Sequence, residues 1–234
     1  MGLSTNVFFS FVGAEVLQHA QTYYLNVRAT DNAGHSVVAS SDGVIIDITP
    51  ALHGLVEHGL HATVARQYSR FTNVALMRWT GVVDPESGVL LYEYGLGETT
   101  QLTEDGQPDL VPFVPIGLGD QAAVADVTLV HTHVYYGFVR VLNGVGLRSV
   151  STSTGFMVDV TRPDCTLRDG SREGADLEFS TTGIPRGYVQ CVDLESGVPT
   201  IDWGIGTVRG WDDTQPFITA PATSQAIPAY QDNL

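Results

Sequence analysis

The chain contains an internal sequence repeat, and a repeat limits the choice of fold more than any single motif does. Residues 23–34 return as residues 135–146 in the same order and without a gap. Both copies begin with a pair of tyrosines and carry valine and arginine at matching places. We call the sequence separation between these two copies the tyrosine spacing. Residues 43–47 match residues 155–159 at the same separation. These segments therefore represent one structural unit that occurs more than once.

A second motif repeats at almost the same spacing. The run DPESGV at residues 84–89 is matched by DLESGV at residues 193–198, and we call this offset the aspartate spacing. In both copies a Gly-x-Gly sequence follows the run at the same distance. Two different motifs at nearly equal spacing indicate a module of about 100 residues, which is the size of an immunoglobulin-like sandwich.

Threonine and proline residues mark the expected module boundaries. Each repeated Gly-x-x-x-Asp run is followed by a threonine and a nearby proline, Thr49 and Pro50 in the first copy and Thr161 and Pro163 in the second. Only the segment between these boundaries contains both motifs. We therefore expect three parts: the C-terminal part of a module at residues 1–47, a complete module at residues 48–160, and the N-terminal part of a following module at residues 161–234.

Hydrophobic residues alternate with polar or small residues in the repeated segments. Tyr23, Leu25, Val27 and Ala29 show this period of two, which is typical of a strand with one face in a core. A turn sequence follows each copy, and another β-rich run follows each turn. No convincing amphipathic helix interrupts the pattern. The sequence therefore predicts an all-β fold of tandem antiparallel β-sandwich modules, one complete and two partial.

The pattern Tyr-x-Leu-x-Val-x-Ala-x-Asp-x-x-Gly-x-Ser that begins at Tyr23 resembles the F strand and F–G turn of fibronectin type III domains. Trp79 and Tyr92 resemble the B-strand tryptophan and the C-strand tyrosine of that family. The resemblance implies that Tyr23 and Tyr135 are tyrosine-corner residues, whose hydroxyl groups bond to nearby backbone. It places all four aromatic residues in the structural core. Gly137 departs from the pattern at an inward-facing position.

Residues 41–50, together with the Asp-x-x-Ser-Gly motif, are similar to repeats in long secreted or surface proteins of eukaryotic microbes and simple animals. That resemblance implies a non-catalytic structural or adhesive segment: a scaffold, an adhesin, or a surface filament such as a mastigoneme. The expected location is extracellular or the cell surface. The expected partners are neighbouring modules of the same or another chain, with cell-surface glycoproteins and glycans as further candidates.

A function from a different class stays open. The chain could be a glycan-binding or spacer region of a larger secreted enzyme, recognising glycans through exposed aromatic side chains such as Trp211 and Tyr230. No nucleophile elbow, phosphate-binding glycine-rich loop or His-Glu-x-x-His motif is present in the sequence. We therefore expect no catalysis by this chain and no cofactor.

The charge balance argues against one class of partner. The chain has 26 acidic and 11 basic residues, a formal net charge of −15, whereas nucleic-acid binding requires clustered lysine and arginine. No apolar stretch approaches the ~20 residues that cross a bilayer. We expect neither a nucleic-acid partner nor a membrane span. An acidic surface favours solubility, and it also suits calcium, which binds oxygen ligands.

Two pairs of carboxylates are candidate calcium ligands. Asp84 and Glu86 form the first pair, and Asp193 and Glu195 form the second at the matching positions of the repeat. The same Asp-x-x-Ser-Gly sequence also forms a turn in which the aspartate accepts backbone N–H bonds. Of these two interpretations we favour the turn.

Two histidines are candidate zinc ligands. His131 and His133 are two residues apart on an expected strand, so both would face the same side and could bind zinc if a third ligand joined them. Their spacing matches no structural zinc motif. We therefore favour ordinary surface histidines.

The two cysteines, Cys165 and Cys191, both fall in the third part of the chain. Matching the repeat places Cys165 near the start of strand A and Cys191 just beyond the end of strand B, and in sandwiches of this family these two strands run antiparallel. The resemblance therefore implies a disulfide, which would add about 3 kcal/mol of stability and requires an oxidising compartment. Reduced, buried cysteines are the alternative. An Asn-x-Ser/Thr glycosylation site would be one sign of secretion, and the sequence has none.

Overall fold

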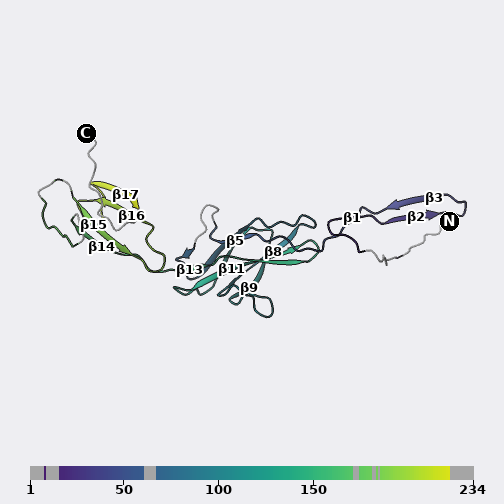
Figure 1. Ribbon diagram of the computed structural model, residues 1–234, viewed down its shortest axis with the longest axis horizontal. Coiled ribbons are helices and arrows are strands. Elements are labelled where there is room, and N and C mark those ends of the chain that lie inside the picture. The colour runs from purple at the N-terminus through teal and green to yellow at the C-terminus, as the bar shows by residue number, and fades with distance from the viewer. Residues whose placement is uncertain are drawn as a thin grey trace, which may run out of the picture. The chain divides into compact units, whose positions relative to one another are not determined.

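The computed structural model describes Phe8 and residues 16–60, 67–170, 174–180, 183 and 185–221 (Figure 1). The regular elements in this part of the chain are all strands, so the fold is all-β as the alternation predicts. No helix of the described segments is long and apolar enough to span a membrane. The chain divides into two compact units: residues 1–66, 75–126 and 134–156 form the first, and residues 67–74, 127–133 and 157–234 form the second.

Two sheets pack face to face as a sandwich in the first unit. The smaller sheet has the strand order β10–β7–β5. In the larger sheet β11 lies between β8 and β12, and β8 also pairs with β9, all antiparallel. The bounds are Leu55–His58 (β5), Val74–Thr80 (β7), Val89–Gly97 (β8), Val111–Gly117 (β9), Gln121–Ala125 (β10), Val134–Asn143 (β11) and Arg148–Thr152 (β12).

Alternate side chains of the central strands fill the space between the two sheets. In β7, Ala75, Met77 and Trp79 are buried, while the residues between them are half-buried. The Trp79 ring lies 5.7 Å from the ring of Tyr92 on β8, measured between centroids. Val139 of β11 is also fully buried. One face of each central strand therefore forms the core, which is the two-residue period read from the sequence.

The four aromatic residues expected in the core differ in burial. Trp79 and Tyr135 are buried, whereas Tyr23 and Tyr92 are only half-buried. The Tyr23 hydroxyl accepts a hydrogen bond from the backbone N–H of Gln18 at 2.9 Å. A tyrosine corner makes this kind of contact. Tyr23 is half-exposed because its strand, β1, pairs only with β4 among the described strands.

Gly137 occupies its inward position on β11 for a steric reason. A Cβ atom at this place would stand 3.2 Å from Cε of Met77, which lies on the facing sheet. Such a contact is closer than well-packed cores normally allow. Glycine therefore leaves the space that the long Met77 side chain occupies.

An N-terminal hairpin in the first unit repeats the geometry of β11 and β12. Asn26 lies opposite Ser40 in the hairpin, as Phe138 lies opposite Thr152 in the sandwich, one tyrosine spacing later. Five successive residue pairs keep this register. The hairpin strands and the short pair beside them are Asn26–Thr30 (β2), Ser36–Ser40 (β3), Thr22–Tyr23 (β1) and Val44–Ile45 (β4).

Three further strand pairs are described, of which the first, β6 with β13, belongs to the larger sheet that contains β11. β6 pairs in parallel with β13, whereas β14 with β15 and β16 with β17 are antiparallel. Their bounds are Tyr68–Ser69 (β6), Phe156–Val158 (β13), Asp164–Asp169 (β14), Gly187–Val192 (β15), Thr200–Ile205 (β16) and Gln215–Pro221 (β17).

A disulfide joins Cys165 of β14 to Cys191 of β15. The two residues lie directly opposite each other in the antiparallel pair, with their Cα atoms 4.1 Å apart. The sequence led us to expect this pairing, but Cys191 lies within its strand and not beyond its end. The bridge closes a loop across a sequence separation of 26 residues.

The β16–β17 hairpin matches the β8–β9 hairpin in detail. Oδ1 of Asp109 accepts the backbone N–H of Glu98 at 2.7 Å, and Oδ1 of Asp213 accepts the backbone N–H of Thr207 at the same distance. In both hairpins an aspartate from the connecting loop therefore binds the residues just after the first strand. This likeness extends the second repeat from the sequence to the backbone.

Candidate functional site

A cluster of polar side chains lies beside the turn that connects β7 to β8. We call it the Asp47 cluster; its members are His19, Asp47, Asp84, Glu86, Ser87 and Asn143, all in the first unit. Asp47 follows β4, and Asn143 is the last residue of β11. The side chain of Asp47 is only 1% exposed, and Asn143 is fully buried. The cluster is thus built from segments far apart in the sequence.

Asp84 organises the turn between β7 and β8. Its Oδ1 accepts hydrogen bonds from the backbone N–H groups of Ser87 and Gly88, at 2.9 and 3.0 Å. Its Oδ2 accepts a hydrogen bond from Nδ2 of Asn143 at 3.1 Å. Burial by itself would raise the pKa of Asp84, but these hydrogen bonds favour the charged form and hold the pKa below its ordinary value. The Asp84 carboxylate therefore stabilises the turn to which it belongs.

Asp47 links the segment after the N-terminal hairpin to that turn. The hydroxyl of Ser87 donates a hydrogen bond to Oδ2 of Asp47, and Nδ2 of Asn143 donates another to the same oxygen at 3.0 Å. Oδ1 of Asp47 accepts the backbone N–H of Thr49 at 3.0 Å. Burying a carboxylate is costly unless its oxygens are hydrogen-bonded. These donors are what permit Asp47 to be buried.

His19 closes the cluster on its outer side. Its Nδ1 accepts the backbone N–H of Ile48 at 3.4 Å, so the proton of the neutral ring belongs on Nε2. Nε2 lies 3.5 Å from Oε1 of Glu86, and Nδ1 lies 3.9 Å from Oδ1 of Asp47. The imidazole therefore stands between two carboxylates that come from different repeated motifs.

The same arrangement occurs a second time, in the second unit. We call it the Asp159 cluster; its members are His131, Asp159, Asp193, Glu195 and Ser196. Nδ1 of His131 lies 3.9 Å from Oδ1 of Asp159, and its Nε2 lies 3.9 Å from Oε1 of Glu195. The hydroxyl of Ser196 donates to Oδ2 of Asp159 at 2.6 Å. Oδ1 of Asp193 accepts the backbone N–H groups of Ser196 and of the glycine that follows it.

Every member of the Asp159 cluster has a counterpart in the Asp47 cluster. His131 and Asp159 follow His19 and Asp47 by the tyrosine spacing, and the Asp-x-Glu-Ser residues follow theirs by the aspartate spacing. The pKa of Asp159 is held below its ordinary value, chiefly by the Ser196 hydroxyl and then by the Thr161 hydroxyl. Both sequence motifs thus converge on one repeated site.

Each cluster offers donor atoms that suit a divalent cation. The ligand atoms of His19, Asp47 and Glu86 lie within 4.8 Å of one another, as do those of a second set, Asp159, Asp193 and Glu195. Carboxylate oxygens suit calcium, and the histidine nitrogen also admits zinc. The carboxylates of Asp47 and Asp159 are already engaged by hydroxyl and backbone donors. These hydrogen bonds satisfy the two aspartates and make each of them part of a link between segments distant in the sequence.

The structure brings the expected ligands Asp193 and Glu195 together in one set, whereas of the pair Asp84 and Glu86 only Glu86 belongs to the corresponding set. Asp84 and Asp193 bind their own turns, while Glu86 and Glu195 face the histidines. The expectation that His131 and His133 share one face of a strand is wrong. Both precede β11 in a turn, because Thr132 has a φ of 66° and breaks the extended backbone. His131 turns toward the Asp159 cluster, and His133 is exposed outside it.

Sequence reasoning overlooked the residues that make these clusters. His19 belongs to no local motif, and the repeated motifs that contain Asp47, Ser87 and Asn143 do not reveal partners that are tens of residues away. One signal was available, because His19 and His131 stand at the same place in the repeat that relates Tyr23 to Tyr135. A polar residue that recurs in register with a structural repeat is a candidate contact between repeated units.

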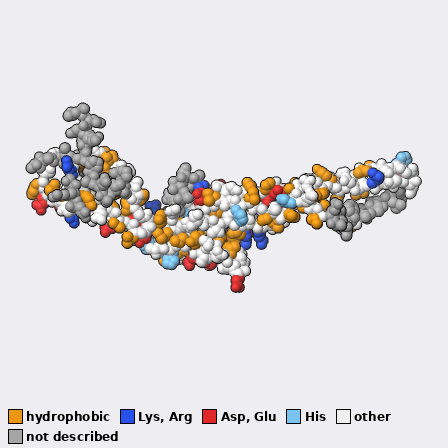
Figure 2. All heavy atoms as spheres, viewed as in Figure 1, with side chains coloured by type: hydrophobic (Ala, Val, Ile, Leu, Met, Phe, Trp, Pro, Cys, Tyr) orange, Lys and Arg blue, Asp and Glu red, His pale blue; other side chains and the backbone are white. Residues whose placement is uncertain are grey.

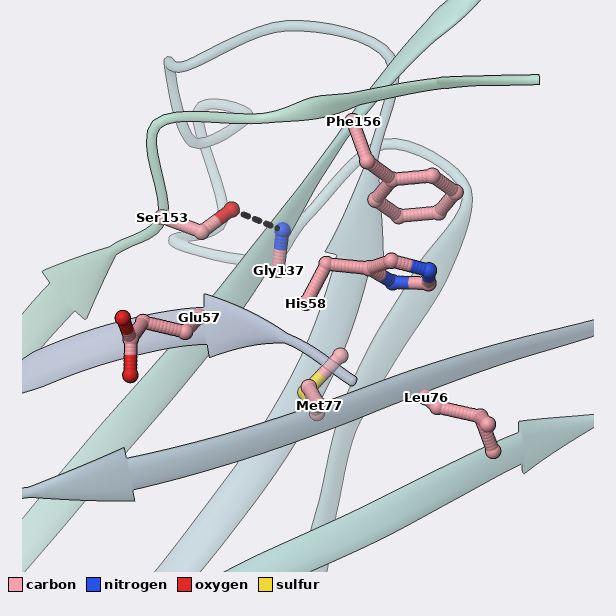
Figure 3. A pocket seen from close by; sticks show the side chains of 7 residues that line it. All are labelled: Glu57, His58, Leu76, Met77, Gly137, Ser153 and Phe156. Carbon is pink, nitrogen blue, oxygen red and sulfur yellow. Dashed lines mark hydrogen bonds between the residues drawn. The ribbon is translucent and has the colours of Figure 1, made fainter. Parts of the chain in front are cut away.

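A narrow space in the central sandwich is a packing feature and not a ligand site. Figure 3 shows the seven residues that line it, among them His58, Met77, Gly137, Ser153 and Phe156. The ring of His58 stacks on that of Phe156 with centroids 3.8 Å apart, and Oγ of Ser153 accepts the N–H of Gly137 at 2.9 Å. The space leaves no room for a water molecule.

On the face seen in Figure 2, the described residues form no large cluster of positive charge. Basic side chains among the described residues there are scattered between polar and hydrophobic ones. Of the two aromatic residues singled out for glycan stacking, Trp211 is 62% exposed, while Tyr230 lies outside the described residues.

No family model matches the chain, and a search of the curated proteins finds no match either.

Proposed function

We propose that the chain is a non-catalytic structural segment of an extracellular or cell-surface protein, built from fibronectin type III-like modules that act as spacers. One observation carries the proposal. The histidine, aspartates, glutamate and serine of the Asp159 cluster all recur in the Asp47 cluster, at matching positions and at closely similar distances. A site that recurs once in each repeat is a site that each successive module needs.

The chemistry of the clusters suits a joint between modules. In the proposed division at residues 1–47, 48–160 and 161–234, Asp47 ends one module and Ser87 belongs to the turn of the next. Asp159 and Ser196 stand in the same relation. A buried, hydrogen-bonded carboxylate between two modules opposes hinge motion, because breaking the link leaves an unpaired charge away from water. A stiff joint is what a scaffold or filament requires.

The disulfide between Cys165 and Cys191 is the observation that supports an extracellular or cell-surface location. Disulfides persist in secreted and surface proteins and are rare in reducing compartments. The bridge between Cys165 and Cys191 therefore supports an extracellular or cell-surface setting.

The dynamics of the full chain test this function. In the wild type, backbone ¹⁵N relaxation should give the β2–β3 hairpin and the β8–β11 strands the same rotational correlation time. Combining Ser87→Ala with Asp47→Ala removes the link, so the hairpin should then tumble faster than the sandwich. Glu104→Arg, on an exposed loop, is a control that should change nothing. A wild-type hairpin that already tumbles independently would contradict the proposal.

Glycan binding is the second candidate function, and the exposure of Trp211 favours it. An exposed indole provides a flat apolar surface with a polar N–H group, which suits contact with a sugar ring. Screening the chain on a glycan array tests this function. Binding that disappears in Trp211→Ala would support it, and a blank array would exclude it for the glycans present.

A further inference from the structure

The Asp47 cluster contains the chain's only asparagine that is followed by glycine, Asn143 with Gly144. Asn143 ends β11 and is fully buried, whereas Gly144 lies in the turn that follows and is exposed. The backbone nitrogen after an asparagine can attack the side-chain amide of that asparagine, and glycine at this place favours the attack because it has no Cβ to restrict the approach. The sequence therefore makes Asn143 the asparagine of this chain most prone to deamidation.

The structure of the cluster requires both members of this reactive pair. Nδ2 of Asn143 donates hydrogen bonds to Oδ2 of Asp47 at 3.0 Å and to Oδ2 of Asp84 at 3.1 Å. A Cβ atom on Gly144 would stand 2.4 Å from the carbonyl oxygen of Ser87, which is too close for a packed contact. The amide and the missing side chain thus each serve the cluster.

An aspartate at the matching position of the N-terminal hairpin shows what the amide adds. Oδ1 of Asp31 accepts the backbone N–H groups of the residues two and four positions later, both at 2.9 Å. Oδ1 of Asn143 accepts the same two groups in its own turn, at 3.2 and 2.8 Å. An aspartate therefore holds this turn as an asparagine does. The amide adds the hydrogen bonds to the two carboxylates, which a carboxylate cannot donate.

The closed cluster opposes the reaction of this pair. The backbone N–H of Gly144 donates to the carbonyl oxygen of Gly88 at 3.0 Å, and the amide of Asn143 is hydrogen-bonded through both its nitrogen and its oxygen. For attack, the nitrogen must lose its proton and the amide must turn toward it, so hydrogen bonds of both groups must break first. Deamidation therefore requires local opening of the cluster.

We propose that Asn143 is a deamidation site which the closed Asp47 cluster protects, and that deamidation after opening keeps the cluster open. Hydroxide removes the proton from the Gly144 nitrogen, which then forms a bond to Cγ of Asn143. The bond from Cγ to Nδ2 breaks, and Nδ2 takes up a proton from water and leaves as ammonia. Water then opens the resulting succinimide ring at either carbonyl and gives aspartate or isoaspartate at this position.

The product cannot restore the hydrogen bonds of the cluster. A donor is replaced by a third carboxylate beside Asp47 and Asp84, and the side chain of Asp47 is only 1% exposed. Like charges this close and away from water repel each other strongly. The ammonia is lost, so the change does not reverse. This inference goes beyond the proposed function, because it depends only on the contacts within one cluster.

The rate of deamidation tests the protection. The full chain is kept in mildly alkaline buffer, and peptide mapping by mass spectrometry follows Asn143 and its products over time. The folded wild type should react at least about tenfold more slowly than the same chain unfolded in urea, because the reaction waits for local opening. Exposed Asn32, which is followed by alanine, is an internal reference whose rate should be equal in all folded samples.

One variant opens the cluster and a second is its matched control. Asp47→Ala removes an acceptor of the Asn143 amide and should speed the reaction about threefold or more. Asp159→Ala removes the equivalent carboxylate of the Asp159 cluster and should leave the rate at Asn143 unchanged. Equal rates at Asn143 in the folded and unfolded wild type overturn the inference without any variant. Equal rates in Asp47→Ala and Asp159→Ala overturn it as well.

The variant Asn143→Asp tests whether the product keeps the cluster open, because it places the product's carboxylate there directly. Amide hydrogen exchange at Gly144 should become about tenfold faster than in the wild type, since the hydrogen bond of Gly144 belongs to the cluster. Exchange in β7 should not change, which shows that the sandwich itself is intact. Unchanged exchange at Gly144 would overturn the claim that deamidation holds the cluster open.

Discussion

At the residue scale, a few carboxylates carry much of the local order. Asp84 and Asp193 each bind two or more backbone N–H groups of their own turn, and Asp47 and Asp159 each bind the serine of that turn. The Asp-x-x-Ser-Gly sequence predicts the turn, because the spacing of acceptor and donors is local. It does not predict the partner of the serine, which comes from another part of the chain.

Replacing Asp84 with alanine should destabilise the central sandwich by about 2 kcal/mol, because it removes charged hydrogen bonds and leaves the buried Asn143 without one acceptor. Urea unfolding of the full chain measures the loss. Asp105→Ala is the matched control, since Asp105 is exposed and accepts from the hydroxyl of Thr103. Equal losses in the two variants would refute the role given to Asp84.

The pH dependence of stability follows from the same residues. The folded-state pKa values of Asp84 and Asp159 lie below the ordinary value of 3.8. Their contribution to stability is therefore complete above pH 3.8 and is lost as the pH falls through the lower, folded-state values. Urea midpoints measured from about pH 6 down to about pH 2 should fall most steeply below about pH 4. The double variant Asp84→Asn with Asp159→Asn should show a shallower fall, and an unchanged slope would count against this account.

At the element scale, the sequence predicts the strands better than it predicts the backbone conformation of the turns that connect them. The alternation at Ala75, Met77 and Trp79 gives β7 and its buried face, because a period of two depends only on neighbouring residues. The same reasoning failed at His131 and His133, where the positive φ of Thr132 ends the extended backbone. Side-chain patterns do not report a single residue of left-handed backbone, and threonine is an uncommon choice for one.

The contact between two turns depends on a glycine. Gly144 follows β11, and its backbone N–H donates a hydrogen bond to the carbonyl oxygen of Gly88 at 3.0 Å. A Cβ atom on Gly144 would stand 2.4 Å from the carbonyl oxygen of Ser87. Gly144→Ala should therefore cost about 1–3 kcal/mol in unfolding free energy. Gly119→Ala should cost much less, because a Cβ there meets only ordinary contacts. Thermal unfolding of both variants decides the point.

The disulfide should stabilise its own strand pair and nothing further away. Reduction, or Cys165→Ser with Cys191→Ser, should lower the local stability of β14 and β15 by about 3 kcal/mol. Amide exchange in these strands should then accelerate, while exchange in β7 and β11 stays unchanged. Two titratable thiols in the denatured, unreduced chain would show that the bridge is absent.

At the scale of the whole molecule, the repeat is the feature that organises everything else. It relates β2–β3 to β11–β12, β16–β17 to β8–β9, and one polar cluster to the other. The alternation within the repeated segments predicted the all-β class, which the strands confirm, while the spacing of the repeats predicted a module of about 100 residues. The same comparison marks His19 and His131 as recurring polar residues, but it does not identify their partners, which approach only after the strands have paired.

The most direct test of this account is a pair of double-mutant cycles, Asp47→Ala with Ser87→Ala and Asp159→Ala with Ser196→Ala. Amide exchange at Gly88 and Gly197 gives the local opening free energy for each variant. If the two clusters are the same structural link, both cycles should give coupling energies of about 1 kcal/mol or more, with the same sign. A coupling energy near zero in either cycle would contradict the claim that this link recurs from one repeat to the next.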